Sequence, residues 1–270
     1  GLDFGFSLLW TLVLSVIATI VLQEMAARLG IISQKGLSEV IRDEIKNPLT
    51  KNIVITLILL AIVIGNAAYE AGNISGGVLG LESVFGEKSL NILGLNINFY
   101  GILLGLIAFI VLFIGNYKVL EKSLIFLVII MSVSFIITAV TTKPDFLKLI
   151  EGLFIPKFPK GSILIIIGLI GTTVVPYNLF LHASLVKEKW NKVSDLKFAR
   201  NDTIIAIVIG GIVSMCIVIS SASLEIESIN NAADLAKGIE PLYGYSSKYI
   251  LAVGLFSAGI TSAITAPLAA

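Results

Sequence analysis

Hydrophobic residues gather in seven long uncharged segments, and charged residues lie in short clusters between them. A helix needs about 20 apolar residues to cross the hydrocarbon core of a bilayer, and each segment is of that order. The pattern therefore predicts seven membrane-spanning helices. The predicted spans are residues 4–23, 52–69, 89–117, 123–142, 161–186, 203–224 and 249–270. Residues 38–45 and 193–199 are expected to form short amphipathic helices between spans.

Composition narrows the class of protein. Of the 270 residues, 56% are hydrophobic and 14% are charged, whereas a soluble domain is about 45–50% apolar and about 25% charged. This balance excludes a soluble enzyme, a nucleic-acid binder and a disordered chain. We expect an all-α polytopic membrane protein whose main partner is the lipid bilayer. The sequence does not indicate an oligomeric state.

Lysines and arginines predict the orientation, because cytoplasmic loops carry an excess of them. The loops after the first, third and fifth predicted spans hold twelve basic residues, and the other three loops hold seven. We therefore expect the first group of loops to be cytoplasmic and the N-terminal end of this chain to lie outside. The chain begins with Gly1 and shows no signal peptide, so we expect it to be processed or to be a fragment.

One carboxyl group lies within the second apolar segment. Glu70 shares a helical face with Asn66, Asn73 and Gly77, which lie at the spacing of successive turns. Ionisable residues in a span are costly and mark candidate functional sites. Carboxylate and amide oxygens suit a hard cation, and a carboxylate also suits a proton path. The alternative is a structural cluster at a close helix crossing, helped by nearby glycines.

Pro176 lies in the middle of the fifth span. Proline lacks an N–H and clashes with the carbonyl about four residues earlier, so we expect the helix to bend or unwind around residues 171–175. Broken helices with exposed carbonyls form ion sites in secondary transporters. The alternative is a plain proline kink. Polar candidates around the break are Thr172, Thr173, Tyr177 and Asn178.

The only histidine of the chain, His182, follows this break. It lacks cysteine or histidine partners, which argues against a soft-metal site, so we expect it to be a proton relay or a structural support. The last span holds Ser257, Thr261, Ser262 and Thr265. We expect these hydroxyl groups to bond between helices, and lining a cavity is the alternative.

At these residues the chain resembles the Nramp family of divalent metal transporters. Residues 7–10 and 22–31 are similar to that family's second helix, and residues 70–77 to the acidic stretch of its third helix. Residues 172–186 resemble its sixth helix, whose usual pattern is Ala-Thr-Val-Met-Pro-His-Asn-Leu-Tyr-Leu-His-Ser. Residues 254–266 resemble its eighth helix. The likeness runs along essentially the whole chain.

The resemblance implies an inverted-repeat fold of the leucine-transporter type, in which the seven spans are helices two to eight. Residues 1–270 are then expected to form a single transmembrane transport domain of a multi-pass protein in the plasma or inner membrane. The family's first helix, which carries an Asp-Pro-Gly-Asn metal motif, and the helices beyond the eighth are expected to lie outside this sequence. The protein would be no enzyme, with a transported ion and no cofactor.

Departures from the family pattern suggest which ion is carried. Val175 stands where the family has a metal-binding methionine, and Thr172 where it has an alanine whose carbonyl coordinates the metal. A soft thioether favours Mn²⁺ and Fe²⁺ over hard cations. Without it, the remaining oxygen and amide ligands give no reason to exclude Mg²⁺.

Further departures concern the proton route that the family uses. Tyr177 replaces the family's first histidine of the sixth helix, and Asn73 replaces a glutamate of the third. Glu70 stands in for the aspartate of that helix, and Ile260 for a glutamine of the eighth. Together these changes resemble the Nramp-related magnesium transporters, a branch with a hydrated ion site and no proton coupling.

The resemblance thus implies transport of Mg²⁺, and of Mn²⁺, by alternating access without proton coupling. The implied metal-site residues are Thr172, Val175, Tyr177, Asn178, Glu70 and Asn73. Two alternatives are a proton-coupled Mn²⁺ or Fe²⁺ importer of the Nramp type and an organic-solute permease on the same fold. An intramembrane enzyme is disfavoured, because the sequence has no Gly-x-Ser-x-Gly, no paired aspartates and no His-Glu-x-x-His motif.

Overall fold

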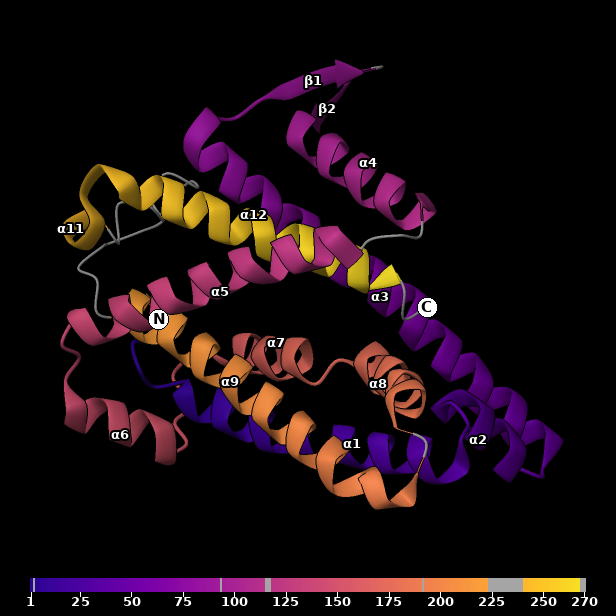
Figure 1. The fold of residues 1–270 in the computed structure, drawn as a ribbon. Helices are drawn as coiled ribbons and strands as arrows, with labels where there is room; N and C mark the ends of the chain where they lie inside the picture. The colour runs from indigo at the N-terminus through magenta and orange to yellow at the C-terminus, as the bar shows by residue number, and fades with distance from the viewer. Residues whose placement is uncertain (2, 93, 115–117, 191, 223–239, 268–270) are drawn as a thin grey trace. The chain divides into compact units, whose positions relative to one another are not determined.

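The computed structural model describes residues 1, 3–92, 94–114, 118–190, 192–222 and 240–267 (Figure 1). These residues fall into two compact units, and each is described by itself. Unit 1 contains Gly1–Gly5, Ala68–Phe146 and Cys216–Pro267, and unit 2 contains Phe6–Ala67 and Leu147–Met215. The expectation that residues 1–270 form a single transport domain stays a prediction.

Within the described residues, five helical segments are long and apolar enough to cross a membrane. They are Leu9–Ser33, Pro48–Phe85, Ile163–Lys189, Val193–Ala222 and Gly244–Thr265. The two remaining predicted spans contain shorter apolar helices, Phe99–Ile114 and Val128–Thr141. The chain is therefore mainly helical, as predicted for a polytopic membrane protein. Three of the predicted span ends, at residues 117, 224 and 270, lie outside the described residues.

Unit 2 is formed by helices from the first, second, fifth and sixth predicted spans. Its elements are α1 (Leu9–Ser33), α2 (Leu37–Glu44), the first part of α3 (Pro48–Phe85), most of α6 (Phe146–Phe154), α7 (Ile163–Thr173), α8 (Pro176–Lys189), the 3₁₀ turn η1 (Val193–Asp195) and most of α9 (Leu196–Ala222). Helix α1 packs against both α7 and α8, so it supports the two halves of the fifth span.

The crossing of α1 and α8 depends on a glycine. A Cβ atom on Gly30 would overlap with the backbone carbonyl of Ala183, and Ala183 is fully buried. Small residues at such a crossing let two backbones approach closely. Around it, one apolar cluster joins the three helices α1, α8 and α9. Its buried members are Ala27, Ile31, Val186 and Ala199.

Of the two short amphipathic helices that the sequence predicts, the structure contains the first but not the second. Residues 38–45 were expected to be helical, and α2 covers Leu37–Glu44. A contact of 2.6 Å between Lys35 Nζ and Asp43 Oδ2 joins the chain before α2 to its last turn. The expectation of a separate helix at 193–199 is wrong, because η1 runs directly into α9, with no proline or glycine to end the helix.

Unit 1 combines the end of the second span with the third, fourth and seventh. Its elements are the rest of α3, the strands β1 (Ser89–Ile92) and β2 (Leu95–Asn98), α4 (Phe99–Ile114), α5 (Lys118–Thr141), α11 (Glu240–Tyr243), the 3₁₀ turn η2 (Gly244–Ser246) and α12 (Ser247–Thr265). Helix α12 packs against α4 and α5. The core between α3, α4 and α12 includes Val78, Leu104, Ile260 and Ala263.

The start of the third predicted span forms a hairpin instead of a helix. Strands β1 and β2 pair antiparallel, with Ser89 opposite Asn98 and Ile92 opposite Leu95. Apolar and polar residues alternate in both strands, which is a strand pattern, and Gly94 has a φ of +82° that suits a tight turn. Asn98 then caps α4, since its Oδ1 accepts hydrogen bonds from the N–H groups of Tyr100 (3.0 Å) and Gly101 (3.3 Å).

Candidate functional site

The fifth predicted span is broken, as expected. Helix α7 ends at Thr173 and α8 begins at Pro176, with Val175 between them in extended conformation (φ −88°, ψ 126°). Proline suits the first position of a helix, because the N–H that it lacks would have no intrahelical partner there. The break falls at residues 174–175, inside the region that the sequence indicates.

A break of this kind places two helix ends in one span. The last carbonyls of α7 form a partially negative end, and the first N–H groups of α8 form a partially positive end. Thr172 Oγ1 donates to the carbonyl of Gly168, and Thr173 Oγ1 donates to that of Leu169, both at 2.7 Å. Both hydroxyl oxygens keep lone pairs that can accept a hydrogen bond or bind a cation.

Unit 2 brings four of the six predicted metal-site residues to this break. Thr172 is exposed at the end of α7, and Tyr177 and Asn178 are half-buried in the first turn of α8. The Val175 side chain between them is buried, with 6% exposed. The Thr173 carbonyl lies 3.5 Å from Thr19 Oγ1 of α1, so α1 backs the break within this unit.

The other two predicted metal-site residues, Glu70 and Asn73, belong to α3 in unit 1. Their side chains are close enough to interact. Yet the buried atoms Glu70 Oε2 and Asn73 Nδ2 have no hydrogen-bond partner in the described part of the chain. Buried polar atoms are nearly always satisfied, so an unsatisfied carboxylate oxygen identifies Glu70 as a candidate ligand for a cation or a proton.

A close helix crossing, which is the structural alternative for this face of α3, is also present one to two turns after Glu70. A Cβ atom on Gly259 of α12 would lie 2.6 Å from the Gly77 nitrogen and 2.7 Å from the Asn73 carbonyl oxygen. Gly77 and Gly259 therefore form a close helix crossing, whereas Cβ atoms on Gly72 and Gly76 would meet open space. The crossing explains Gly77 and leaves Glu70 to another role.

His182 is held by a residue that the sequence reasoning did not identify. Its Nε2 lies 3.0 Å from Oγ1 of Thr203 on α9, and Thr203 is buried with 3% exposed. The Thr203 hydroxyl also lies within hydrogen-bond distance of the carbonyl of Ala199, at 2.9 Å, so it links the imidazole to the backbone of α9. No sequence signal marks Thr203, because a threonine in an apolar helix is usually unremarkable.

The hydroxyl groups of Ser257, Thr261 and Thr265 bond within their own helix, α12, so the expectation of bonds between helices is wrong for these three. Ser257 Oγ donates to the Val253 carbonyl at 2.6 Å, and Thr261 Oγ1 donates to the Ser257 carbonyl at 2.6 Å. Thr265 Oγ1 repeats the pattern with Thr261 at 3.1 Å. In an apolar helix the carbonyl four residues back is always within reach. Ile260, on the same helix, is buried in the core of unit 1.

Comparisons with known proteins fit this arrangement of helices. A divalent metal cation transporter MntH of Klebsiella pneumoniae is 27% identical, and the match covers 100% of this chain and 64% of that protein. An MntH of Yersinia pestis is 25% identical, with 100% and 65% covered. The chain thus spans about two thirds of the length of these curated relatives.

Solved structures show the same fold. The Eremococcus coleocola manganese transporter, crystallised as a histidine-to-alanine mutant, has a TM-score of 0.70 and 21% identity, covering 100% of this chain and 58% of that one. The same transporter with an aromatic bis-isothiourea compound has a TM-score of 0.69 and 20% identity. The fold expected from the sequence is therefore confirmed. All of residues 1–270 match the family described as natural resistance-associated macrophage protein-like, and the chain belongs to this Nramp family.

Proposed function

We propose that the protein transports divalent metal cations across a cell membrane by alternating access, that Mg²⁺ and Mn²⁺ are its substrates, and that transport is not coupled to protons. The observation that carries the proposal is the break between α7 and α8, whose flanking side chains offer oxygen and amide ligands but no sulfur. Negative and positive helix ends at such a break suit an ion and its counter-charges.

The ligand chemistry favours a hard cation. Thr172, Tyr177 and Asn178 flank the break with hydroxyl, phenol and amide groups, and Val175 contributes only hydrocarbon. Glu70 and Asn73 of α3 add a carboxylate with an unpartnered oxygen and an amide. Mg²⁺ prefers oxygen ligands and retains several waters, so a site with few protein ligands suits it. Mn²⁺ accepts the same ligands.

The role proposed for His182 is structural support. Its Nε2 is hydrogen-bonded to Thr203, whose hydroxyl also lies 2.9 Å from a backbone carbonyl of α9. A histidine that relays protons must exchange a ring proton during each cycle. The proposed orientation places the loops after the first, third and fifth spans in the cytoplasm, following their excess of basic residues.

The second candidate function is proton-coupled import of Mn²⁺ or Fe²⁺. The names of the relatives favour it, since the curated ones are divalent metal cation transporters and the solved structures are manganese transporters. In this case Glu70, which has an unpartnered carboxylate oxygen, would carry the proton.

Uptake into liposomes separates the two candidates. The full-length protein is reconstituted with an entrapped indicator for Mg²⁺ or Mn²⁺ and, in parallel, with an entrapped pH indicator. The proposal expects influx of both metals and no acidification beyond that of protein-free liposomes. Acidification driven by Mn²⁺, without Mg²⁺ flux, overturns it and supports the second candidate.

Substitution at the break tests whether position 175 touches the ion. Val175→Met supplies the missing thioether and is expected to shift the ratio of Mn²⁺ to Mg²⁺ uptake toward Mn²⁺. Val174→Met adds the same side chain one residue earlier and is the matched control. Equal selectivity of the Val175→Met variant and the wild type would show that the side chain at 175 does not contact the metal.

A further inference from the structure

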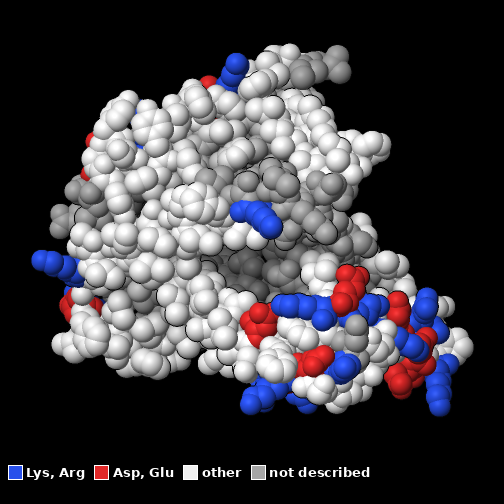
Figure 2. Space-filling model, viewed as in Figure 1, with Lys and Arg blue, Asp and Glu red and all other residues white. Residues whose placement is uncertain are grey.

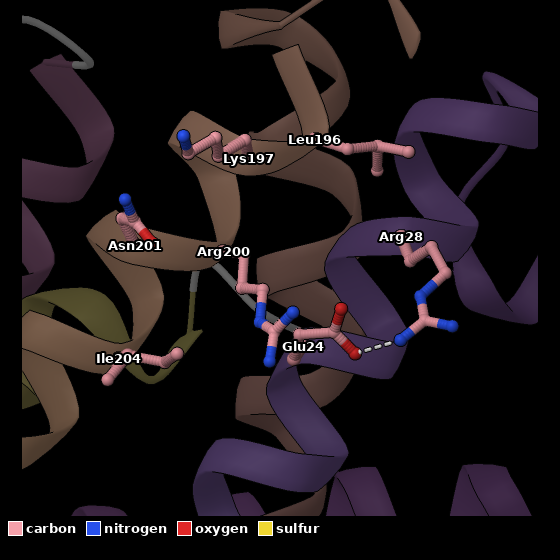
Figure 3. Close-up of a pocket in the computed structure, with 7 residues that line it drawn as sticks. All are labelled: Glu24, Arg28, Leu196, Lys197, Arg200, Asn201 and Ile204. Carbon is pink, nitrogen blue, oxygen red and sulfur yellow. Dashed lines mark hydrogen bonds and ion pairs between the residues drawn. The ribbon is translucent and has the colours of Figure 1, made fainter. Parts of the chain in front are cut away.

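A cavity of about 650 Å³ lies in unit 2, between the last turns of α1 and the first turns of α9 (Figure 3). None of the predicted metal-site residues lines it. The residues that line it are Glu24, Arg28, Leu196, Lys197, Arg200, Asn201 and Ile204. Figure 2 shows that charged side chains gather over the start of α9 and over α2, so this end of the unit is set apart from its apolar helices.

The charges around the cavity favour an anion. Arg28 pairs with Glu24 at 2.5 Å across one helical turn, which neutralises both groups. Lys197 and Arg200 remain, and neither forms an ion pair within the described residues. In Figure 3 the Arg200 side chain extends toward Glu24, and both residues line the cavity. Arginine and lysine together are the usual ligands of a phosphate group, and arginine binds it in a bidentate manner.

A second, smaller cavity adjoins the first through Arg28. It has a volume of about 280 Å³ and is lined by Met25, Arg28, Leu29, Ile32 and Ser33 of α1. Met25 and Ile32 are each 57% exposed. We call this second cavity the apolar groove. The polar cavity thus continues into a hydrocarbon-lined surface, with one arginine shared by both.

Both helices carry exposed hydrocarbon leading toward these cations. On α1 the exposed residues Leu14, Ile17, Val21 and Met25 follow one helical face that continues to Arg28. On α9 the exposed residues Ile205, Ile209 and Ile212 follow the cationic first turns. A span that is apolar along its length and basic at its end is typical of a surface facing lipid tails and then headgroups.

We propose that the cavity binds the phosphate group of an anionic phospholipid, with an acyl chain of the same lipid in the apolar groove. Free inorganic phosphate offers the same anionic chemistry, but it would leave the groove empty. The positive charge of Lys197 and Arg200 supplies attraction to the anion, and Met25, Leu29 and Ile32 supply apolar contact. The site is separate from the proposed transport function, and its test needs no transport measurement.

Native mass spectrometry of the full-length protein tests the proposal. The protein is released from detergent in the presence of phosphatidylglycerol, phosphatidylcholine or inorganic phosphate, and bound molecules are counted. We expect phosphatidylglycerol to be retained and phosphatidylcholine to be lost. Lys197→Gln with Arg200→Gln should lower phosphatidylglycerol retention by about tenfold or more, because each basic group contributes to headgroup attraction. The control is Arg42→Gln with Lys46→Gln, which also removes one arginine and one lysine but outside the cavity. It should change phosphatidylglycerol retention little.

Glu24→Gln is expected to increase lipid retention, and a misfolded variant would not show such an increase. The substitution removes the carboxylate that pairs with Arg28 and toward which Arg200 extends, so it should raise phosphatidylglycerol retention severalfold. Equal retention of the two lipids, or equal losses in the two double variants, would overturn the proposal. Inorganic phosphate retained as well as phosphatidylglycerol, with no effect of Met25→Gln, would overturn the assignment of the ligand as a lipid.

Discussion

His182 and Thr203 join α8 to α9 through a hydrogen bond of 3.0 Å between Nε2 and Oγ1. The Thr203 hydroxyl also lies 2.9 Å from the Ala199 carbonyl of its own helix. The orientation of the only histidine ring in the chain is therefore set by a threonine 21 residues away.

Removing the Thr203 hydroxyl should destabilise unit 2. Thr203→Val keeps the shape of the side chain but leaves the half-buried Nε2 of His182 without its hydrogen-bond partner, at a cost of about 1–3 kcal/mol. Thr203→Ser keeps the hydroxyl and should retain most of the stability. Thermal unfolding of the purified variants measures both, and equal midpoints for Thr203→Val and wild type would contradict the role given to this bond.

Gly30→Ala should be strongly destabilising, although alanine is a better helix former than glycine. Its methyl group would overlap with the Ala183 carbonyl, which belongs to a backbone and has no other rotamer to adopt. The control is Gly168→Ala in α7, where a Cβ atom meets open space. We expect the control to be neutral or stabilised by up to about 1 kcal/mol. Thermal unfolding midpoints that move together in the two variants would argue against a backbone contact between α1 and α8.

Asn98 should contribute to the start of α4 in two ways. Its Oδ1 accepts from two backbone N–H groups, and its Nδ2 donates to Glu82 Oε1 at 2.6 Å. Asn98→Ala removes both interactions and is expected to cost about 1 kcal/mol or more. Asn98→Asp keeps the cap but faces Glu82 with a second carboxylate, so the repulsion should lower stability and added salt should restore part of it. Thermal unfolding of both variants at low and high salt separates the loss of the cap from the repulsion of the two carboxylates.

The Lys35–Asp43 contact should show itself in the titration of Asp43. The hydrogen bond and charge of Lys35 lower the pKa of the Asp43 carboxyl group, and the carboxylate raises the pKa of Lys35. Stability from Asp43 is therefore present above its ordinary pKa of about 3.9 and lost as the pH falls through the lowered value. Stability from Lys35 is present below about 10.4 and lost as the pH rises through the raised value.

A carbon NMR titration of the Asp43 carboxyl group measures its pKa. Lys35→Gln should return the pKa of Asp43 toward its ordinary value. Lys46→Gln, which removes a charge that forms no ion pair with Asp43, should leave the titration close to that of the wild type. If the pKa of Asp43 is the same in both variants and in the wild type, the contact between Lys35 and Asp43 does not persist in solution.

The features that the sequence predicted well are those decided locally. Pro176 interrupts its helix whatever surrounds it, so the break could be placed within a few residues. The hairpin at 89–98 was also local, but its alternation was hidden inside a longer apolar run, and the apolar count outweighed it. The role of Gly30 could not be predicted, because its partner Ala183 is 153 residues away and the contact is made by a carbonyl that every residue has.

The residues of the candidate site also differ in whether local sequence or distant contacts determine them. The residues flanking the break were predicted from their position around one proline and from the family resemblance, and Glu70 from its isolation in an apolar segment, and their role in binding a metal stays a prediction. The bond that holds His182 required knowing that α8 and α9 lie side by side. The basic residues of the cavity lie on α1 and α9, whereas the sequence pattern placed them in two loops and distinguished them only by their charge.

The contact between Gly30 and Ala183 limits how the broken span can move. With backbone touching backbone, α8 slides or tilts only if α1 travels with it or if the crossing separates. Val174 and Val175 lie outside this crossing, and Val175 is extended, as the residue before a proline prefers. A change of angle at this joint would therefore carry α1 along with α8, and the packing of α1 on α7, including the contact between Thr19 and the Thr173 carbonyl, would have to slip.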